Sequence, residues 1–429
     1  MKRLFQVTGP NGSGKTSALR FLGTSPQAAS LLFPLPALAD FHVRSTAIGF
    51  QAGQNVIFSR SVKSLLTTPL VFAGVSGGDA TRRVTDLLNR FGFAYLLQRD
   101  YLTLSGGERQ FVALFSCLLS DVDLYLLDDP VVMMDNERAT KILQVIADCV
   151  EAKGQTAYGV TSVRPEYYAN LKGRDIVHLG YSPQTAACLR QFDTLLTSLT
   201  HFRQRQMVIS IQKMTMSPYG RILLRGACQE WHSGETVLLT GGNGTGKTCL
   251  LQTVAGILKP SSGSVSMQTY GRPAERPEIG RNCFYLPQQF TSLLGFDTLV
   301  QELQVTAAAA WWREILNFIF DWRIVNPELR VPESSLGERH FCNILAAVSA
   351  LARNSGPAAL LLDEPDSGLD ELRCQLLTRL LAWLAAQDYF IGVVSHHPLV
   401  FAGSGAIPLK LRECTIDQQQ LVVRDPVCG

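Results

Sequence analysis

The chain has 429 residues, a formal net charge of only +3 and 46% hydrophobic residues. This length suggests two or three domains, and the small charge, without long blocks of one sign, does not indicate a nucleic-acid partner. Ten cysteines without a C-x-x-C pair are typical of reduced thiols in a cytosolic protein. No run of 18 apolar residues occurs, so we expect no membrane-spanning helix. A strand and a glycine-rich loop begin at once, so we expect no signal peptide.

Two glycine-rich loops share one pattern. Leu4–Thr8 is expected to form a strand that leads into G-P-N-G-S-G-K-T at Gly9–Thr16, and G-G-N-G-T-G-K-T follows at Gly241–Thr248, 232 residues later. Both fit the P-loop, in which the backbone wraps the phosphates of ATP, the lysine reaches the β- and γ-phosphates and the hydroxyl binds Mg²⁺. The repeat predicts two duplicated α/β domains. The candidate ATP-binding residues of the loops are Gly9, Pro10, Asn11, Gly12, Ser13, Gly14, Lys15, Thr16, Gly241, Gly242, Asn243, Gly244, Thr245, Gly246, Lys247 and Thr248.

A second motif, L-S-G-G-E at Leu104–Glu108, follows the first P-loop. Its glycines would open a helix whose first backbone amides form an anion site. With a P-loop before it, this motif resembles the signature of the ATP-binding cassette (ABC) ATPases. The resemblance implies that Ser105, Gly106 and Gly107 meet the γ-phosphate bound by the opposite domain.

The first domain departs from this family at its acidic strand. Leu124–Asp128 reads L-Y-L-L-D, a buried-looking strand that places Asp128 for Mg²⁺. The family then has a glutamate that positions the attacking water, but here Asp129 is one methylene shorter. Ser162 aligns with the family's γ-phosphate histidine. The resemblance therefore implies degenerate catalytic motifs in this half.

One glutamine in each half matches the family's Q-loop: Gln51, with Gln54 as a rival, and Gln288, with Gln289 as a rival. For Gln51 and Gln54 an ordinary loop amide is the alternative. Phe50–Val62 loosely resembles cassettes of energy-coupling-factor importers. The resemblance suggests the following Mg²⁺ ligands: Thr16, Thr248, Gln51, Gln288, Asp128 and Asp363.

The second domain is expected to begin with a strand-rich segment, Met207–Cys228. By resemblance Tyr219 would stack on adenine there, unless it is an ordinary turn tyrosine. The first domain has no room for this antiparallel segment before its P-loop. The predicted parts are a first cassette at 1–180, a linker with a helix at 181–206 and a second cassette at 207–429.

The second half carries the catalytic residues that the first lacks. Asp363 ends its acidic strand and Glu364 follows. His396, with His397 as a rival, comes after a later apolar strand. The resemblance implies that Glu364 positions the attacking water, that His396 contacts the γ-phosphate and that Lys247 stabilises the charge on it.

The second signature, Ser334–Glu338, is altered. Ser335 and Gly337 fit the family, but Leu336 replaces the first glycine and puts a side chain where backbone should approach phosphate. Before it, residues 307–322 read as an aromatic helix, for which core packing is favoured and docking of a membrane partner is the alternative.

Taken together, the motifs predict an α/β protein with two tandem ABC-type P-loop domains, each with a helical subdomain. The resemblance implies that the cassettes pair head to tail. The expected function is ATP hydrolysis that powers an ABC transporter through separate membrane-spanning subunits, with import favoured, on the cytosolic face of the cell membrane. The alternative is a soluble twin cassette acting on ribosomes or nucleic acid, similar to the ABC-F type. We expect no nucleic acid, because the linker is short and weakly charged.

This pairing predicts one competent and one degenerate ATP site. The second P-loop with Glu364 and the first signature should hydrolyse ATP. The first P-loop with Asp129, Ser162 and the altered signature should bind ATP and turn it over slowly, because small misplacements of catalytic groups cost large factors in rate.

Overall fold

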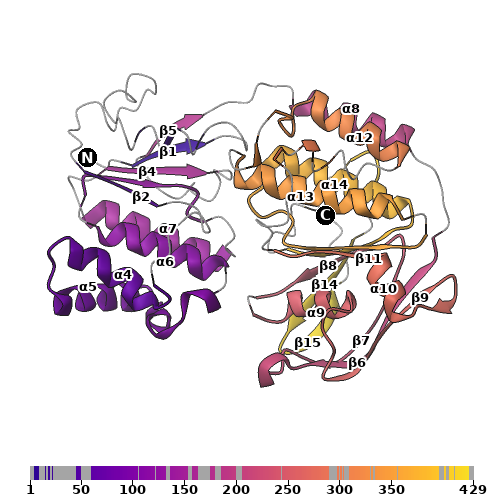
Figure 1. Ribbon diagram of the computed structural model, residues 1–429, viewed down its shortest axis with the longest axis horizontal. Helices are drawn as coiled ribbons and strands as arrows, with labels where there is room; N and C mark the ends of the chain where they lie inside the picture. The colour runs from indigo at the N-terminus through magenta and orange to yellow at the C-terminus, as the bar shows by residue number, and fades with distance from the viewer. Residues whose placement is uncertain are drawn as a thin grey trace. The chain divides into compact units, whose positions relative to one another are not determined.

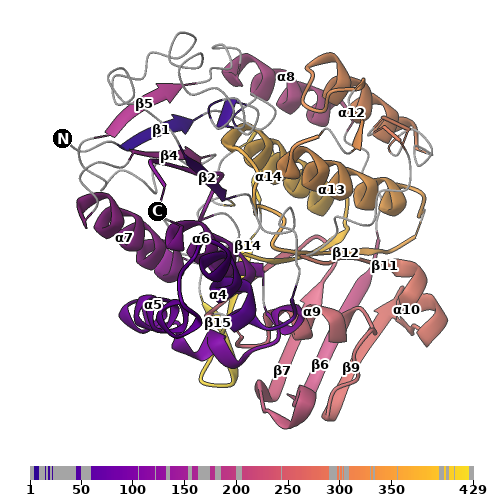
Figure 2. The ribbon, with the colours of Figure 1, turned by 60° about the vertical axis from the view of Figure 1, so that its left-hand side comes forward.

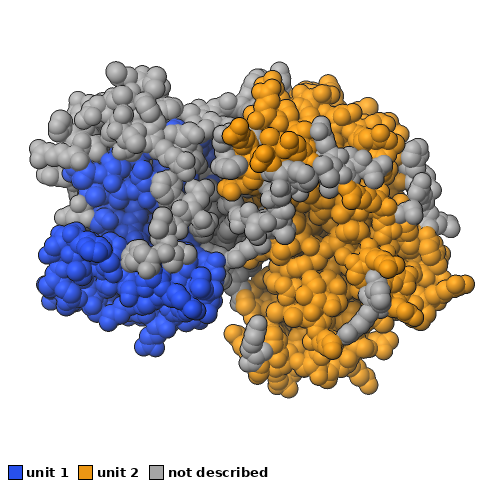
Figure 3. Space-filling view, viewed as in Figure 1, with its two compact units in different colours: residues 1–181 blue, residues 182–429 orange. Residues whose placement is uncertain are grey.

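A computed structural model of the chain describes residues 4–8, 15, 18–19, 22, 45–49, 59–104, 106–120, 122–131, 136–152, 157–162, 174–178, 185–199, 205–242, 244–288, 297–298, 300–301, 303, 309–328, 330–331, 334–354, 356–395, 401, 405–409 and 411–424. The chain divides into two units, residues 1–181 and 182–429 (Figure 3). None of the helices formed by the described residues combines the length and the apolar character that a membrane crossing requires.

The first unit is built on a parallel sheet with the strand order β2-β3-β4-β1-β5 (Figure 1). Its strands are β1 (Leu4–Thr8), β2 (Thr46–Gly49), β3 (Leu124–Leu127), β4 (Ala157–Ser162) and β5 (Arg174–His178). The register pairs Thr8 with Ser162. The strand that leads into the first P-loop therefore ends beside the position predicted to replace the family's histidine.

Helices cover one face of this sheet and extend outward from it (Figure 1). They are α6 (Gly106–Leu119) and α7 (Asn136–Ala152) next to the sheet, and α4 (Val62–Phe72), α5 (Gly77–Arg90), η1 (Ala94–Gln98) and η2 (Tyr101–Thr103) beyond them. The Ser76 side chain caps α5 by accepting from Asp79 N at 3.2 Å. The rings of Phe93 and Phe111, 4.1 Å apart, join the outer helices to α6. The outer group is the predicted helical subdomain.

The second unit repeats the sheet of the first. Its order is β11-β12-β13-β8-β14-β15, in which the first five strands are parallel and β15 is antiparallel. The strands are β8 (Thr236–Thr240), β11 (Cys283–Leu286), β12 (Ala359–Asp363), β13 (Phe390–Val394), β14 (Leu411–Asp417) and β15 (Gln420–Arg424). Strand for strand the five parallel positions match the first unit, which confirms the duplication read from the sequence.

A four-stranded antiparallel sheet, in the order β10-β9-β6-β7, belongs to the second unit. Its strands are β6 (Met207–Met216), β7 (Leu224–His232), β9 (Ser262–Thr269) and β10 (Arg272–Pro273). Among the described residues of the first unit no strand corresponds to it, as the sequence predicts.

The second unit is layered (Figures 1 and 2). Its helices are α8 (Thr185–Ser198), α9 (Lys247–Val254), α10 (Arg276–Asn282), α12 (Ala310–Asp321), α13 (Leu336–Ala352) and α14 (Glu371–Ala386). Helix α9 contacts β12, β13 and β6, so it lies between the two sheets, whereas α13 and α14 contact the other face of the parallel sheet. Helix α8 packs against α12 and α14 in an outer layer.

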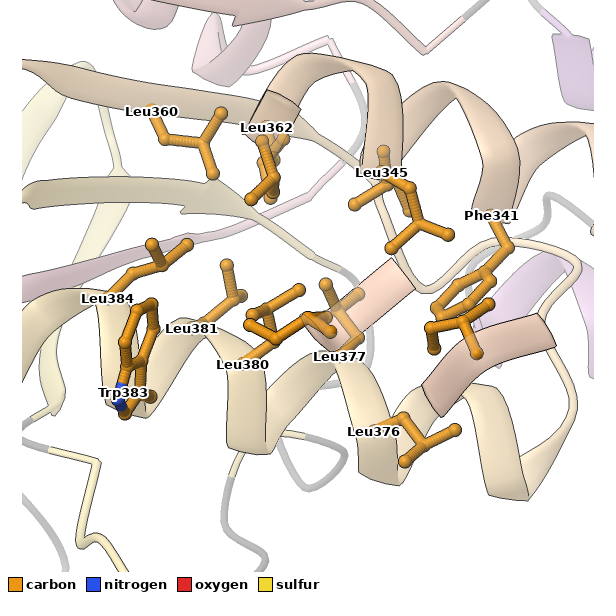
Figure 4. Packing of buried hydrophobic residues seen from close by; sticks show 14 of the residues in the cluster. Phe341, Leu345, Leu360, Leu362, Leu376, Leu377, Leu380, Leu381, Trp383 and Leu384 are labelled. Carbon is orange, nitrogen blue, oxygen red and sulfur yellow. The ribbon is translucent and has the colours of Figure 1, made fainter. Parts of the chain in front are cut away.

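One of two hydrophobic cores of this unit lies between its parallel sheet and the α13–α14 layer, and the other lies around α9 between the two sheets. Figure 4 shows Leu360 and Leu362 of β12 facing Leu377 and Leu381 of α14, with Leu345 of α13 beside them. All five are fully buried. Each such leucine contributes about 1.5–3 kcal/mol through burial. The strand that ends in Asp363 therefore has a well-fixed position.

Helix α8 lies in the stretch predicted as a linker, but the division of the chain places it in the second unit. Cys188, Phe192 and Leu196 recur at helical spacing and are buried. The ring of Phe192 lies 5.0 Å from that of Phe318 in α12. The apolar stripe thus makes this helix part of a core.

The aromatic helix α12 also packs inward. Trp312 is fully buried, and the ring of Trp311 lies 4.8 Å from that of Trp383 in α14. Phe318 and Trp322 are partly buried against the same core. These contacts support core packing over partner docking for this helix.

Candidate active site

The predicted catalytic residues of the second unit lie along one edge of its parallel sheet. In the register Asp363, at the end of β12, pairs with Val394 of β13, and Val394 pairs with Leu239 of β8. The P-loop, Glu364 and Ser395 therefore leave the sheet at the same carboxyl edge. Ligands of open parallel α/β sheets bind at this edge.

Three described glycines of the second P-loop have positive φ, and two of them are also confined by neighbouring atoms. Gly241 has φ 131° and Gly246 has φ 109°, backbone values that side chains rarely adopt. A Cβ at Gly241 would lie 2.8 Å from Ile416 O, and one at Gly246 would lie 3.0 Å from Leu223 Cβ. Both space and backbone conformation require glycine, so the loop keeps its amides available for an anion.

The P-loop lysine lies inside this loop. Lys247 is the first residue of α9, and its Nζ donates to Gly241 O at 2.8 Å and to Gly242 O at 2.9 Å. The Thr245 hydroxyl also donates to Gly242 O at 2.9 Å. The residue is only 6% exposed, and hydrogen bonds to the loop carbonyls stabilise its buried ammonium group.

The carboxyl group of Asp363 is buried and interacts with Thr248, Glu364 and Tyr285. Burial raises the pKa of its carboxyl to about 6, and the charge of Glu364 adds to this rise, while a hydrogen bond from Thr248 lowers it. The Tyr285 hydroxyl donates to Asp363 Oδ2 at 3.4 Å. Its Oδ1 is buried and has no hydrogen-bond partner among the described residues.

These oxygens suit Mg²⁺. This ion prefers oxygen ligands and is usually held by one or two carboxylates together with substrate phosphates. A carboxylate and a hydroxyl, Asp363 and Thr248, lie together here beside the P-loop. The residues therefore fit the ion that the sequence predicts.

Glu364 has a backbone conformation that its neighbours must hold. Its φ is 52°, in the left-handed region that costs about 1–2 kcal/mol for a residue with a side chain. Its N–H donates to Val394 O at 2.9 Å, and its carbonyl accepts from Ser367 N at 3.1 Å. Gln288 Nε2 donates to Glu364 Oε2 at 2.6 Å. The Q-loop glutamine thus contacts the predicted water-positioning carboxylate.

The second signature forms a helix cap. Ser335 Oγ accepts from Glu338 N at 3.1 Å, and Glu338 Oε2 accepts from Ser335 N at 3.0 Å. This reciprocal pair is a capping box. Gly337 is buried in the first turn of α13. The serine that the sequence predicts at phosphate is engaged in starting α13.

A buried arginine joins this cap to the turn after Glu364. Arg373 Nη1 donates to Asp370 Oδ2 at 2.5 Å, Nη2 donates to Ile324 O at 2.5 Å, and Nη2 lies 3.8 Å from Glu338 Oε1. Arg373, Asp370 and Glu338 are each at most 5% exposed. Removing one member of such a network leaves the others as buried charges without compensation.

The first unit shows the same arrangement where it is described. Lys15 is buried in a helix, and Asp128 N donates to Gly49 O at 2.8 Å. Asp128 and Asp129 are buried, and Asp129 has φ 48°, close to the value at Glu364. Gly106 and Gly107 open α6, as the signature predicts. The shorter acid therefore sits on the same backbone conformation.

The turn that holds Tyr219 lies next to the second P-loop. Leu223 N donates to Met216 O at 2.9 Å and so closes the turn. Met216 Cε and Leu223 Cβ lie 3.6 Å and 3.0 Å from the position of a Cβ at Gly246. The adenine contact of Tyr219 stays a prediction.

Several predicted residues lie outside the described part of the chain. They are Gly9, Pro10, Asn11, Gly12, Ser13, Gly14, Thr16, Gln51, Ser105, Asn243 and His396, with the rivals Gln54, Gln289 and His397. The side chains of Ser162, Tyr219 and Leu336 are likewise not described, although their backbones are.

Sequence reasoning missed two residues near Glu364. Tyr285 contacts Asp363, as given above, and no motif in a single sequence marks it. His340 lies 2.8 Å, through Nε2, from Pro365 O. A signal for His340 does exist, because the position two residues after the signature glutamate also holds a buried hydrogen-bonding residue, Gln110, in the first unit.

Comparison with known proteins gives consistent results. A family model described as "ABC transporter" matches residues 1–132 and 224–367. A "Putative ABC transporter ATP-binding protein" of Methanosarcina mazei is 27% identical over 435 residues, which cover 92% of this chain and 84% of that protein.

Two solved structures share the fold. An "RNase-L Inhibitor" aligns with a TM-score of 0.60 at 18% identity and covers 98% of this chain and 85% of that one. A chain of a "Model of ribosome-bound archaeal Pelota and ABCE1" aligns with a TM-score of 0.64 at 17% identity, covering 98% and 74%. With the family match over both halves, the repeated sheet and the two P-loops, the chain belongs to the ABC transporter family and is an ATPase with two tandem cassettes.

Proposed function

We propose that this ATPase powers an ABC transporter through separate membrane-spanning subunits, and that most hydrolysis uses the second P-loop. The observation that carries the catalytic assignment is the contact of Gln288 with Glu364 at 2.6 Å, next to Asp363 and Thr248. The residues proposed to position water, bind the metal and bind phosphate lie at one edge of the sheet, which supports the assignment. The name of the Methanosarcina mazei relative supports the transporter role.

In the proposed mechanism the loop amides and Lys247 bind the β- and γ-phosphates of ATP. Lys247 exchanges the carbonyls of Gly241 and Gly242 for phosphate oxygens, and so stabilises the charge that develops during transfer. Glu364 orients a water molecule for in-line attack and accepts its proton. Thr248 and Asp363 would hold Mg²⁺, whose positive charge would offset the negative charge of the triphosphate. His396 would contact the γ-phosphate.

The two cassettes are proposed to pair head to tail, as in the family. The second P-loop would then act with the first signature, Leu104–Glu108. The first P-loop would act with the capped, leucine-containing second signature and with Asp129. This pairing gives one fast and one slow site. Gln51 and Ser162 would belong to the slow site.

We favour import over export, because Phe50–Val62 loosely resembles cassettes of energy-coupling-factor importers. The proposed location is the cytosolic face of the cell membrane. A tagged chain, purified from detergent-solubilised membranes of its native cells, should retain a multi-spanning protein. A chain that stays alone in the soluble fraction would contradict this proposal.

A ribosome-associated role is the second candidate, because one structural neighbour is described as ribosome-bound. The net charge of +3 gives this candidate little electrostatic support. Sedimentation in a sucrose gradient separates the two. Movement of the chain with ribosomes, in an ATP-dependent and salt-sensitive manner, would favour the second candidate over the transporter.

A further inference from the structure

A buried histidine on α13 contacts the main chain directly after the predicted catalytic carboxylate. His340 is 3% exposed, and its Nε2 lies 2.8 Å from Pro365 O. The backbone of Glu364 is a second hydrogen-bond partner of the ring. The contact reaches from the helix layer to the edge of the sheet where Glu364 lies.

Three further contacts of Glu364 come from other elements. Its N–H is bound to Val394 of β13, its carbonyl to Ser367 within the turn, and its carboxylate to Gln288. A residue with a side chain stays in the left-handed region only where the surrounding structure fixes it. The hydrogen bond from His340 to Pro365 adds a contact from α13 to this segment.

The chemistry at this position requires a donor. A carbonyl oxygen only accepts, so the Nε2 of His340 must carry the proton, and a neutral imidazole in that tautomer suffices. Burial lowers the pKa of His340 to about 4, which keeps the ring neutral at physiological pH. A glutamine amide is also a neutral donor of similar reach. The first unit has Gln110 at this place, 2% exposed, in a cassette whose Asp129 has the same left-handed φ.

We infer that His340 is a positioning residue for ATP hydrolysis: by fixing the Glu364–Pro365 main chain from α13, it holds the Glu364 carboxylate where it can orient water. The inference rests on the proposed catalytic role of Glu364. Because α13 begins with the second signature, the same contact ties that motif to the carboxylate.

The test compares four variants of the full chain in steady-state ATPase assays, fluorescent-ATP binding and thermal unfolding. H340L fills the space without a donor, H340N has an amide of shorter reach, and H340Q restores both donor and reach. L351A, eleven residues further along α13 and near its C-terminal end, removes buried leucine volume far along the helix from His340 and serves as the control for lost stability.

H340L and H340N should lower kcat by ~10- to 100-fold, the range expected from displacing a catalytic group by about 1 Å. Their KM and ATP affinity should change less than about threefold, because the P-loop is intact. H340Q should recover kcat to within about threefold of wild type. L351A should lower the unfolding temperature but keep kcat when assayed below it.

Retention of kcat in H340N and H340L, or an equal loss in H340Q, would overturn the inference. If H340L does not fold, the pair H340N and H340Q decides. E364Q is assayed beside them: if it keeps its rate, the catalytic assignment itself is wrong, whereas loss in E364Q without loss in H340N refutes only the role of His340.

Discussion

The two predicted ATP sites should respond very differently to the same chemical change. Replacing the acid after the Mg²⁺ aspartate by its amide gives Glu364→Gln in the second unit and Asp129→Asn in the first. We expect Glu364→Gln to abolish most ATPase activity and Asp129→Asn to leave most of it.

The magnitudes follow from the geometry. Glu364 accepts a 2.6 Å hydrogen bond from Gln288, and its negative charge would polarise the attacking water. Loss of a positioned general base costs about 10²- to 10⁴-fold. Asp129 has a similar backbone but a side chain one methylene shorter, and a displacement of about 1 Å costs about a hundredfold. The first site should therefore supply only about one hundredth of the turnover.

The assay is the steady-state ATPase rate of the assembled complex, with ATP affinity measured separately by a fluorescent analogue. Both variants should still bind ATP, because neither changes a P-loop. Equal losses from the two substitutions would refute the asymmetry. A high rate that survives Glu364→Gln would place catalysis in the other half of the chain.

Three further predictions concern stability and binding. Burial lowers the pKa of His340 to about 4 in the folded chain, against about 6.5 in the unfolded chain, so on acidification the unfolded state takes up a proton first. As the pH is lowered from about 6.5 to about 4, the free energy of unfolding should therefore fall by ~1.4 kcal/mol per pH unit. Urea titrations should show no such contribution in H340Q. Gly246→Ala should lower the free energy of unfolding by ~1–3 kcal/mol and weaken the binding of fluorescent ATP. Its control is Gly271→Ala, which is also at positive φ but has open space around it and should leave ATP affinity unchanged. Arg373→Ala should cost ~3–5 kcal/mol in chemical unfolding because buried carboxylates lose their partner, and the exposed Arg82→Ala should cost less than about 1 kcal/mol; similar costs for both would contradict the role of burial.

Features with a strong local requirement could be predicted from the sequence. The P-loop at Gly241–Thr248 needs glycines for its backbone, and the acid of β12 needs a buried apolar strand before it. Both patterns are written in consecutive residues, and their repetition gave the two cassettes and the matching strand order.

Features that depend on tertiary contacts could not be predicted. Helix α8 was expected in a linker, because only packing against α12 and α14 shows that its apolar stripe belongs to a core. Arg373 and its partner Glu338 are 35 residues apart in the sequence, and His340 and its partner Pro365 are 25 residues apart. No periodicity or motif encodes such pairs, and only the matching Gln110 hinted at one of them.

The left-handed main chain shared by Asp129 and Glu364 bears on how the two halves diverged. Both halves hold this costly backbone conformation at the acid that follows the predicted Mg²⁺ ligand. The difference between the halves at this point therefore lies in side-chain length and not in the path of the backbone. A return to glutamate at 129 needs no rebuilding of the main chain around it.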